Sequence, residues 1–403
     1  MIYVGIDWAE AHHDVCIEDG EGHVLAKGQV PDGIEGVERI HEMLGAHADE
    51  ASDVAIGIEL DRGLLVGALV AAGYEVHAVN PLAVSRYRDR LGPAGAKSDP
   101  GDARVLAEVM RTDRHLHREV AGDSDLAEAV KVLARAHQNL IWTRQRIGNQ
   151  LRSVLREFYP GALRTFAELG SVDAIAVLGL APTPSAGRAL TETKVRKALA
   201  AGGRKLRLDQ RAGEIVESLR APQLGAPGLV EEAFGHQVAS LVAVLQTLVT
   251  QIDELRAELA RSFEGHPDAE IITSLPGLSS VLGARVLAEF GDDRTRYTDA
   301  RARRSYAGTA PITKASGTRR VVLARVARNK RLADACYGWA FSSLKTSPGA
   351  RAFYDRQRAS AKTHHQALRA LGNRWVGILH GCLEHRRIYR EELGWGGWLE
   401  TAA

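Results

Sequence analysis

Two carboxylates stand at the ends of short apolar runs early in the chain. Asp7 follows residues 2–6, and Glu59 follows residues 54–58. Each run has the composition of a buried β-strand, and open α/β sheets place their sites at the carboxyl ends of strands. The sequence therefore predicts that both side chains lie at one edge of a sheet.

Two more carboxylates open a predicted helix. Asp99 is placed to cap this helix, Pro100 fills its first position, and Asp102 follows on the same face. Apolar residues continue at helical spacing as far as Met110. Because a helix N-terminus tolerates negative charge, a capping role alone accounts for this pair as well as a chemical role does.

Four carboxylates that converge repel one another unless a cation lies between them. Oxygen ligands favour Mg²⁺ or Mn²⁺ over zinc, and the sequence has no competing cluster of histidine and cysteine. We therefore predict that Asp7, Glu59, Asp99 and Asp102 hold Mg²⁺ (or Mn²⁺). Such a site suits phosphoryl transfer on nucleic acid, because the metal polarises the phosphate.

The elements around these acids predict an α/β domain over residues 1–120. The predicted strands are residues 2–6, 14–19, 23–26, 54–58 and 75–79, and the predicted helices are residues 34–44 and 63–72. Three successive strands followed by alternating helix and strand is the order of a ribonuclease-H-like domain.

Length and composition set the broad class. A chain of 403 residues is long enough for several domains, and its net charge of +2 leaves nucleic-acid contacts to local clusters. The three cysteines share no metal spacing, which is typical of free thiols in a reducing cytosol. We find no signal peptide and no apolar stretch of about 20 residues, so we expect a cytoplasmic protein without a membrane span.

Two long amphipathic helices are predicted over residues 124–158 and 229–263. Leu241, Leu245, Leu248, Ile252, Leu255 and Leu259 of the second alternate spacings of four and three, which is typical of a coiled coil. We predict a coiled-coil domain over residues 121–265, paired within the chain or between subunits. An insertion at about residues 167–228 would lie at its tip, with a basic helical segment at residues 193–208.

Residues 266–403 predict a mostly helical C-terminal domain. The segment around Pro276 and Gly277, followed by apolar helical spacing, is similar to a helix–hairpin–helix, in which a glycine turn offers backbone N–H groups to a phosphate. Ser279 stands where that motif usually has its second glycine, so the match is partial.

A one-sided basic stretch follows at residues 301–331. It has no acidic residue, which favours a phosphate-binding surface over an ordinary solvated face. Its cations are Arg301, Arg303, Arg304, Lys314, Arg319, Arg320, Arg325, Arg328, Lys330 and Arg331. Ser316, next to Gly317, lies in the middle and is an unhindered candidate nucleophile.

An ordered set of short motifs at both ends of the chain resembles a known family. The motifs are Gly5-Ile6-Asp7, Ile58-Glu59, Lys97-Ser98-Asp99-Pro100-Gly101-Asp102-Ala103, Leu275-Pro276-Gly277, Tyr306-Ala307-Gly308-Thr309-Ala310-Pro311 and Ser316-Gly317. In this order they resemble the insertion-sequence transposases that have an N-terminal acidic tetrad and a C-terminal serine. That family includes the pilin gene-inverting recombinase and the bridge-RNA-guided recombinases.

The resemblance implies a fold, a mechanism and partners. It implies a RuvC-like (Holliday-junction resolvase) first domain whose tetrad is Asp7, Glu59, Asp99 and Asp102. A separate C-terminal transposase domain would supply Ser316 as the nucleophile that joins donor and target DNA through a phosphoserine. The RNA-guided members imply a structured guide RNA. Because tetrad and serine are far apart in sequence, we expect assembly between domains or subunits, with the coiled coil holding a dimer or tetramer.

Two departures from the family pattern bear on the site. Glu59 is followed by Leu60-Asp61-Arg62-Gly63 instead of a small residue and glycines, so Asp61 is a spare carboxylate near that position. Downstream of Ser316 the family commonly has a Gly-Asn pair, whereas this chain has Arg328-Asn329-Lys330, which indicates a different loop.

Two other classes of function compete. In a metal-dependent junction nuclease, the tetrad would activate water and Ser316 would be a loop residue. A sugar-kinase-like ATPase also opens with a strand that ends in Gly-Ile-Asp, but Trp8-Ala9-Glu10 offers no glycine-rich phosphate turn. A trapped protein–DNA adduct would separate recombination from the nuclease, and stabilisation by ATP would favour the kinase fold.

Overall fold

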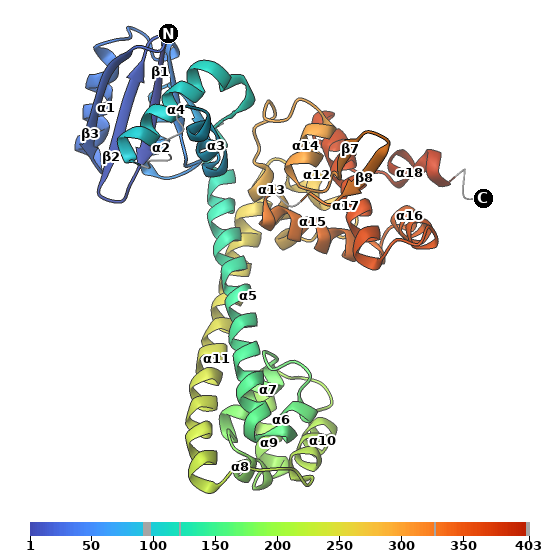
Figure 1. Cartoon of the computed structure of the whole chain (residues 1–403). Coiled ribbons are helices and arrows are strands. Elements are labelled where there is room, and N and C mark those ends of the chain that lie inside the picture. The colour runs from blue at the N-terminus through green and yellow to red at the C-terminus, as the bar shows by residue number, and fades with distance from the viewer. Residues whose placement is uncertain (92–97, 121, 326–327, 400–403) are drawn as a thin grey trace. The chain divides into compact units, whose positions relative to one another are not determined.

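The computed structural model describes residues 1–91, 98–120, 122–325 and 328–399 (Figure 1). The chain divides into two compact units, Met1–Gly122 and Asp123–Ala403. Lys97, the first residue of the predicted Lys-Ser-Asp-Pro motif, lies outside the described residues. The three-part division at residues 120 and 265 stays a prediction.

The described residues of the first unit form one six-stranded sheet with strand order β3-β2-β1-β4-β5-β6. β1, β4 and β5 are parallel, and β2, β3 and β6 are antiparallel to their neighbours. The strands are β1 (Ile2–Trp8), β2 (His12–Glu18), β3 (Val24–Pro31), β4 (Val54–Ile58), β5 (Glu75–Ala78) and β6 (Arg118–Glu119). The five predicted strands are confirmed, and β6 is too short to leave a sequence pattern.

Helices cover both faces of this sheet. α1 (Ile34–Gly45) and α2 (Leu64–Ala71) pack on one face, and α3 (Pro81–Leu91) and α4 (Asp99–Asp113) pack on the other. Short 3₁₀ turns, η1 (Ala51–Asp53) and η2 (Arg114–Leu116), complete the unit. The mixed α/β prediction is confirmed, whereas the ribonuclease-H-like assignment stays a prediction.

Two glycines bring α4 directly onto the central strands. Gly5 of β1 and Gly57 of β4 are register partners. A Cβ at Gly5 would lie 1.8 Å from the carbonyl oxygen of Ala103, and one at Gly57 would lie 2.9 Å from Cγ of Met110. Because either contact would displace the helix, these glycines set how closely α4 approaches the sheet.

The second unit is built on two long helices, α5 (Asp125–Phe158) and α11 (Gly228–Glu264), which lie side by side in opposite directions (Figure 1). On α11, Leu241, Leu245 and Leu259 of the predicted apolar stripe are buried. The intrachain helical hairpin is therefore observed, and coiled-coil packing as such stays a prediction. By length and composition alone α11 could span a membrane, with 28% of its apolar window buried.

Short helices gather at one end of the α5–α11 pair and share a hydrophobic core with it. They are α6 (Pro160–Thr165), α7 (Val172–Leu180), α8 (Pro184–Arg188), α9 (Glu192–Ala201) and α10 (Leu208–Arg220). The predicted basic helical segment at residues 193–208 is wrong in extent. α9 ends at Ala201, and Gly203 and Arg207 adopt positive φ angles of 101° and 51°.

The other end of the pair packs against the C-terminal helices. They are α12 (Ala269–Thr273), α13 (Ser280–Phe290), α14 (Ala300–Tyr306), α15 (Lys330–Ser343), α16 (Pro348–Ala359), α17 (His364–Glu384) and α18 (Glu391–Leu399). Trp339, Trp375 and Trp395 are fully buried among them. The mostly helical character predicted for this region is confirmed.

The predicted glycine turn lies between α12 and α13. Gly277 has a φ of 87°, and a Cβ there would lie 2.6 Å from the backbone nitrogen of Ser343. Trp339 also donates a hydrogen bond to the Pro276 carbonyl (3.0 Å). Packing against α15 therefore requires this glycine, and the helix–hairpin–helix role in phosphate binding stays a prediction.

Candidate active site

The sheet places Asp7 and Glu59 on neighbouring parallel strands. Ile6 of β1 and Ile58 of β4 are register partners, and each acid is the next residue of its chain segment. Asp7 lies within β1, one residue before its end, and Glu59 follows β4 directly. Both side chains are half-buried, at the carboxyl edge where the sequence predicts them.

Helix α4 adds Asp99 and Asp102 from its first turn. The helix begins one residue earlier than predicted, since Ser98 is its N-cap and Asp99 its first residue, and Ser98 caps no backbone N–H with its side chain. Asp99 is exposed, whereas Asp102 is buried. A capping role therefore does not account for either carboxylate.

Arg88 of α3 contacts the buried carboxylate of Asp102. Its Nε donates to Asp102 Oδ1 at 2.7 Å, and its Nη2 contacts the same oxygen. Since both donors meet one oxygen, the guanidinium orients the carboxylate without enclosing its second oxygen.

The pKa of Asp7 shows that the acids act on one another. Burial first, and then the charges of Asp102, Glu59 and Asp99, raise this pKa to about 6. The structure therefore brings all four predicted acids into one electrostatic cluster. Asp61 is exposed and pairs with Arg62 at 3.7 Å, and it is not among the charges that act on Asp7.

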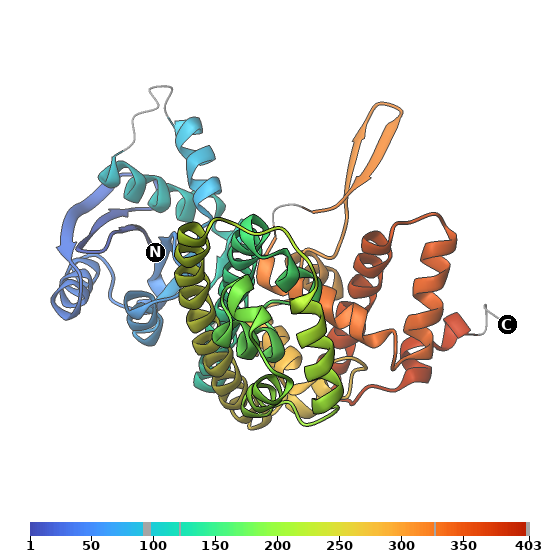
Figure 2. The same ribbon diagram turned by 90° about the horizontal axis from the view of Figure 1, so that it is seen from below.

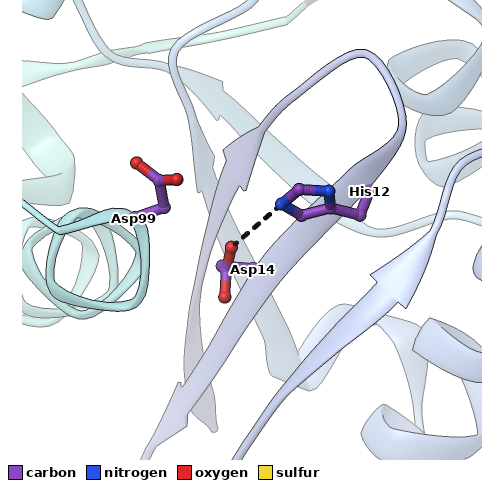
Figure 3. A group of neighbouring side chains, drawn as sticks. All are labelled: His12, Asp14 and Asp99. Carbon is purple, nitrogen blue, oxygen red and sulfur yellow. Dashed lines mark ion pairs between the residues drawn. The ribbon is translucent and has the colours of Figure 1, made fainter.

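Sequence reasoning missed a fifth acid, Asp14 of β2. Asp14 is the register partner of Asp7, it is 94% buried, and its charge also raises the Asp7 pKa. His12 of the same strand approaches it, with Nε2 at 4.0 Å from Oδ2 (Figure 3). Single ligand atoms of His12, Asp14 and Asp99 all lie within 4.8 Å of one another. The alternation of β2 opposite β1 was the available signal, because directly paired residues share a face.

This donor set fits a hard divalent cation. The clustered ligands are mainly carboxylate oxygens, which Mg²⁺ and Mn²⁺ prefer. Among the described residues, the buried Asp14 carboxylate accepts no hydrogen bond, and the basic side chain that approaches it is His12 at 4.0 Å. Burial and then the charges of the neighbouring acids keep the Asp7 pKa high, and a cation would offset the repulsion among those charges.

Ser316 lies in the second unit, at the end of a two-stranded hairpin. β7 (Ile312–Ser316) pairs with β8 (Arg319–Leu323), so that Ser316 and Arg319 face each other across the turn. Gly317 has a φ of 54°, which favours glycine at this position. Figure 2 shows the hairpin extending away from the helices around it, and Ser316 is exposed.

The predicted basic residues differ in their surroundings. Six are exposed, namely Arg301, Lys314, Arg319, Arg320, Arg328 and Lys330, and three are half-buried, namely Arg304, Arg325 and Arg331. Arg331 packs on α5, with its guanidinium 4.8 Å from the centre of the Trp142 ring and its Nη2 donating to Asn139 at 2.8 Å.

Arg303 is the exception, because it lies in the core. It is 6% exposed, and its guanidinium lies 4.7 Å from the centre of the Tyr297 ring and 5.2 Å from that of Phe290. Burial lowers the pKa of this guanidinium from its usual value. The helical position of Arg303 turns its side chain inward, and the prediction that it binds nucleic acid stays a prediction.

Comparison with known proteins defines the class. A DEDD-type IS110 family model, described as a transposase, matches residues 4–160, and the model for the transposase IS116/IS110/IS902 family matches residues 269–355. These two matches define the class as a DNA-acting transposase. The chain belongs to the IS116/IS110/IS902 family of transposases.

Relatives match over nearly their whole length. A Streptomyces coelicolor protein named "Mini-circle putative transposase for IS117" is 46% identical over 410 residues, which cover 100% of this chain and 98% of the relative. The 43.6 kDa protein of insertion element IS110 from the same species is 30% identical over 100% of this chain and 98% of its own. The 42 kDa protein of IS900 from Mycobacterium paratuberculosis is 28% identical over 96% of this chain and 97% of its own. Such transposases cut and transfer DNA strands, and the DEDD-type domain with its clustered acids suggests dependence on a divalent metal.

Proposed function

We propose that this transposase cuts and rejoins DNA through a covalent phosphoserine at Ser316. The observation that carries the proposal is the cluster of acids around Asp7 in a chain of this family. Asp7, Glu59, Asp99 and Asp102 would hold Mg²⁺ (or Mn²⁺), which supplies polarisation of the scissile phosphate when bound. The first unit would have the RuvC-like form of the ribonuclease H fold, and its strand order is compatible with that.

The proposed chemistry keeps the phosphodiester energy. The Ser316 oxygen attacks the phosphorus and loses its proton, a serine–phosphate bond forms, and the strand leaves with a free hydroxyl. A hydroxyl of a second strand then attacks the phosphoserine, which restores the serine and joins the new strand. One phosphodiester is broken and one is formed, so the reaction needs no ATP.

The partners of this reaction are part of the proposal. Donor and target DNA would contact the exposed cations of the basic stretch, such as Arg319 and Arg320. A structured guide RNA would select the DNA by base pairing, as in the RNA-guided members that the sequence resembles. We further propose a cytoplasmic dimer or tetramer assembled through α5 and α11, because the tetrad and Ser316 belong to different units.

A metal-dependent junction endonuclease is the second candidate. Among the described residues, no side chain forms a hydrogen bond with the Ser316 hydroxyl, so no base is in place to activate it. The acid cluster, by contrast, is complete within one unit and could activate water.

A suicide DNA substrate separates the two candidates. Cleavage of a nicked substrate should leave a DNA adduct on the wild-type protein, and peptide mapping should locate it at Ser316. Ser316→Ala should bind the same DNA and form neither adduct nor recombinant, because it lacks one oxygen on an exposed side chain. Ser305→Ala is the matched control and should keep the adduct. Cleavage by Ser316→Ala at the wild-type rate would establish the nuclease mechanism instead.

A further inference from the structure

The motif at residues 306–311 has no role in the chemistry proposed above. Two of its residues, Gly308 and Thr309, line two pockets of the second unit, and Arg369 of α17 lines both as well. The two pockets therefore adjoin at these three residues. Val322 and Leu323 of β8 line the second pocket, which places the pockets at the base of the hairpin that bears Ser316.

The local backbone explains why a glycine stands at the centre of this motif. Gly308 has a φ of 68°, and a Cβ there would lie 2.4 Å from Cβ of Arg328. Arg328 therefore packs on the bare glycine backbone. Thr309 donates a hydrogen bond to Asn373 of α17 at 3.2 Å, which ties the motif to the same helix as Arg369.

The walls of these pockets carry an excess of positive charge. Arg328 and Lys330 line the first, Arg325 and Lys362 line the second, and Arg369 lines both. Among the described residues, none of these five cations forms an ion pair, whereas other arginines of the unit do so, such as Arg351 with Asp355 at 2.8 Å.

The one carboxylate in the walls is already neutralised. Asp334 accepts hydrogen bonds from Arg285 at 2.6 Å and from Gln138 at 3.1 Å. Arg325, by contrast, lacks a partner for one donor, since its Nε is buried and has no hydrogen-bond acceptor among the described residues. A buried donor without an acceptor is costly, so an anion that enters the second pocket would gain a ready partner.

We propose that the two pockets form one groove that binds the phosphate backbone of a DNA strand, with Arg369 at its centre. The exposed apolar side chain of Val322 suits the sugars of such a strand. Lys362, in the connection between α16 and α17, and Arg369 of α17 lie outside the basic stretch at residues 301–331. The inference rests on the proposed function, because it takes DNA as the substrate held beside the Ser316 hairpin.

The groove makes a charge-based prediction for DNA affinity. Arg369→Gln and Lys362→Gln should each weaken binding about fivefold at 0.15 M salt, and each should make the log–log salt dependence shallower by about 0.9, as expected for one lost phosphate contact. The effect should be alike for unrelated DNA sequences, because backbone contacts carry no sequence information.

The measurement is fluorescence anisotropy with short duplexes of two unrelated sequences over a range of KCl concentrations. All variants are made in the Ser316→Ala background, so that covalent capture does not enter the binding curve. Arg351→Gln is the matched control, because this exposed arginine is paired with Asp355 and lines neither pocket. Its affinity and salt slope should match those of the background protein.

The outcomes distinguish the groove from the proposed chemistry. Unchanged DNA binding by both groove variants would overturn the groove and leave the adduct test at Ser316 standing. If the groove variants lose affinity for a structured RNA but not for DNA, the groove is not a DNA-binding site. If Arg369→Gln lowers the melting temperature, the result for Lys362→Gln decides, because Lys362 is exposed and its substitution leaves the core intact.

Discussion

The acid cluster and the Ser316 hairpin differ in how firmly their own surroundings hold them. Asp7 is part of a sheet that continues on both sides of its strand, and α4 lies against that strand without an intervening side chain. Ser316 ends a two-stranded ribbon whose residues are mostly exposed. A two-stranded hairpin that extends from its unit has few contacts of its own, so the proposed chemistry would need bound DNA to hold Ser316 in place.

In the proposed site, the acids would be in place before DNA binds, and the Ser316 hairpin would be ordered only afterwards. The acids are preorganised, and burial first and then the charges of the neighbouring acids raise the pKa of Asp7. The hairpin bears exposed Arg319 and Arg320 beside the serine. DNA that binds these cations would order the nucleophile only when substrate is present.

The largest effect on recombination is expected from a substitution in the acid cluster. Asp102→Asn should lower recombination roughly a thousandfold, because the transition state would lose several kcal/mol of metal-assisted charge stabilisation. Its binding of Mn²⁺, measured by calorimetry, should weaken as well, while DNA affinity stays unchanged. Asp61→Asn is the control and should recombine normally, since Asp61 is exposed and does not act on Asp7. Normal recombination by Asp102→Asn would refute the tetrad.

The second test removes the fit of α4 to the sheet and leaves every carboxylate in place. Gly5→Ala should lower the free energy of unfolding by about 3 kcal/mol, because the new Cβ would lie 1.8 Å from a backbone oxygen of α4. Gly67→Ala is the matched control on α2, where a Cβ meets nothing within 4 Å. It should raise stability by about 0.5–1 kcal/mol through helix propensity. Denaturant unfolding measures both, and equal stabilities would show that α4 does not depend on this contact.

Sequence patterns succeeded where the fold has a strong period. The strands of the first unit and the long helices α5 and α11 follow from alternation and from the spacing of leucines, and the position of Glu59 follows from the end of a buried strand. The clustering of four acids could be predicted because strand ends and a helix start meet at one sheet edge.

Pattern was insufficient where contacts between distant segments decide the outcome. Asp14 joins the cluster through antiparallel pairing of β2 with β1; alternation indicates which residues share a face, but it does not fix the register that sets Asp14 opposite Asp7. Arg303 is buried although it belongs to a basic run, because its helical phase turns it toward Tyr297 and Phe290. Arg369 shares a pocket with Val322 and Leu323 only because α17 packs beside the hairpin, and no local sequence pattern encodes that packing.

The third test addresses the exposed half. Arg319→Gln combined with Arg320→Gln should weaken DNA binding roughly 30-fold at 0.15 M salt and make the salt slope shallower by about 1.8, which corresponds to two lost phosphate contacts. The loss should be alike for all DNA sequences. Arg351→Gln is the control for exposed charge outside the basic stretch, because Arg351 is paired with Asp355 at 2.8 Å. If discrimination between sequences falls while the salt slope stays unchanged, the two arginines read bases and the backbone role is wrong.

The smallest effect is a pH dependence that distinguishes the acid cluster from the hairpin. In the folded protein the Asp7 pKa is about 6, above the value of 3.8 for an unperturbed aspartate. Between about pH 4 and 6 the native state therefore holds a proton that the unfolded chain has lost. Stability of the metal-free protein should fall as the pH rises through this window.

Metal binding should show the opposite trend, because a proton and a cation compete for the same carboxylate. The affinity for Mn²⁺ should rise about tenfold between pH 5 and pH 7 and then level off, since protonation of Asp7 above its pKa is small. Calorimetry in two buffers of different ionisation enthalpy would count the proton released. Asp7→Asn should abolish the slope in both stability and proton release, while Ser316→Ala should leave both unchanged. If stability and proton release still depend on pH in Asp7→Asn, the titrating group is another residue and the electrostatic explanation of the cluster is wrong.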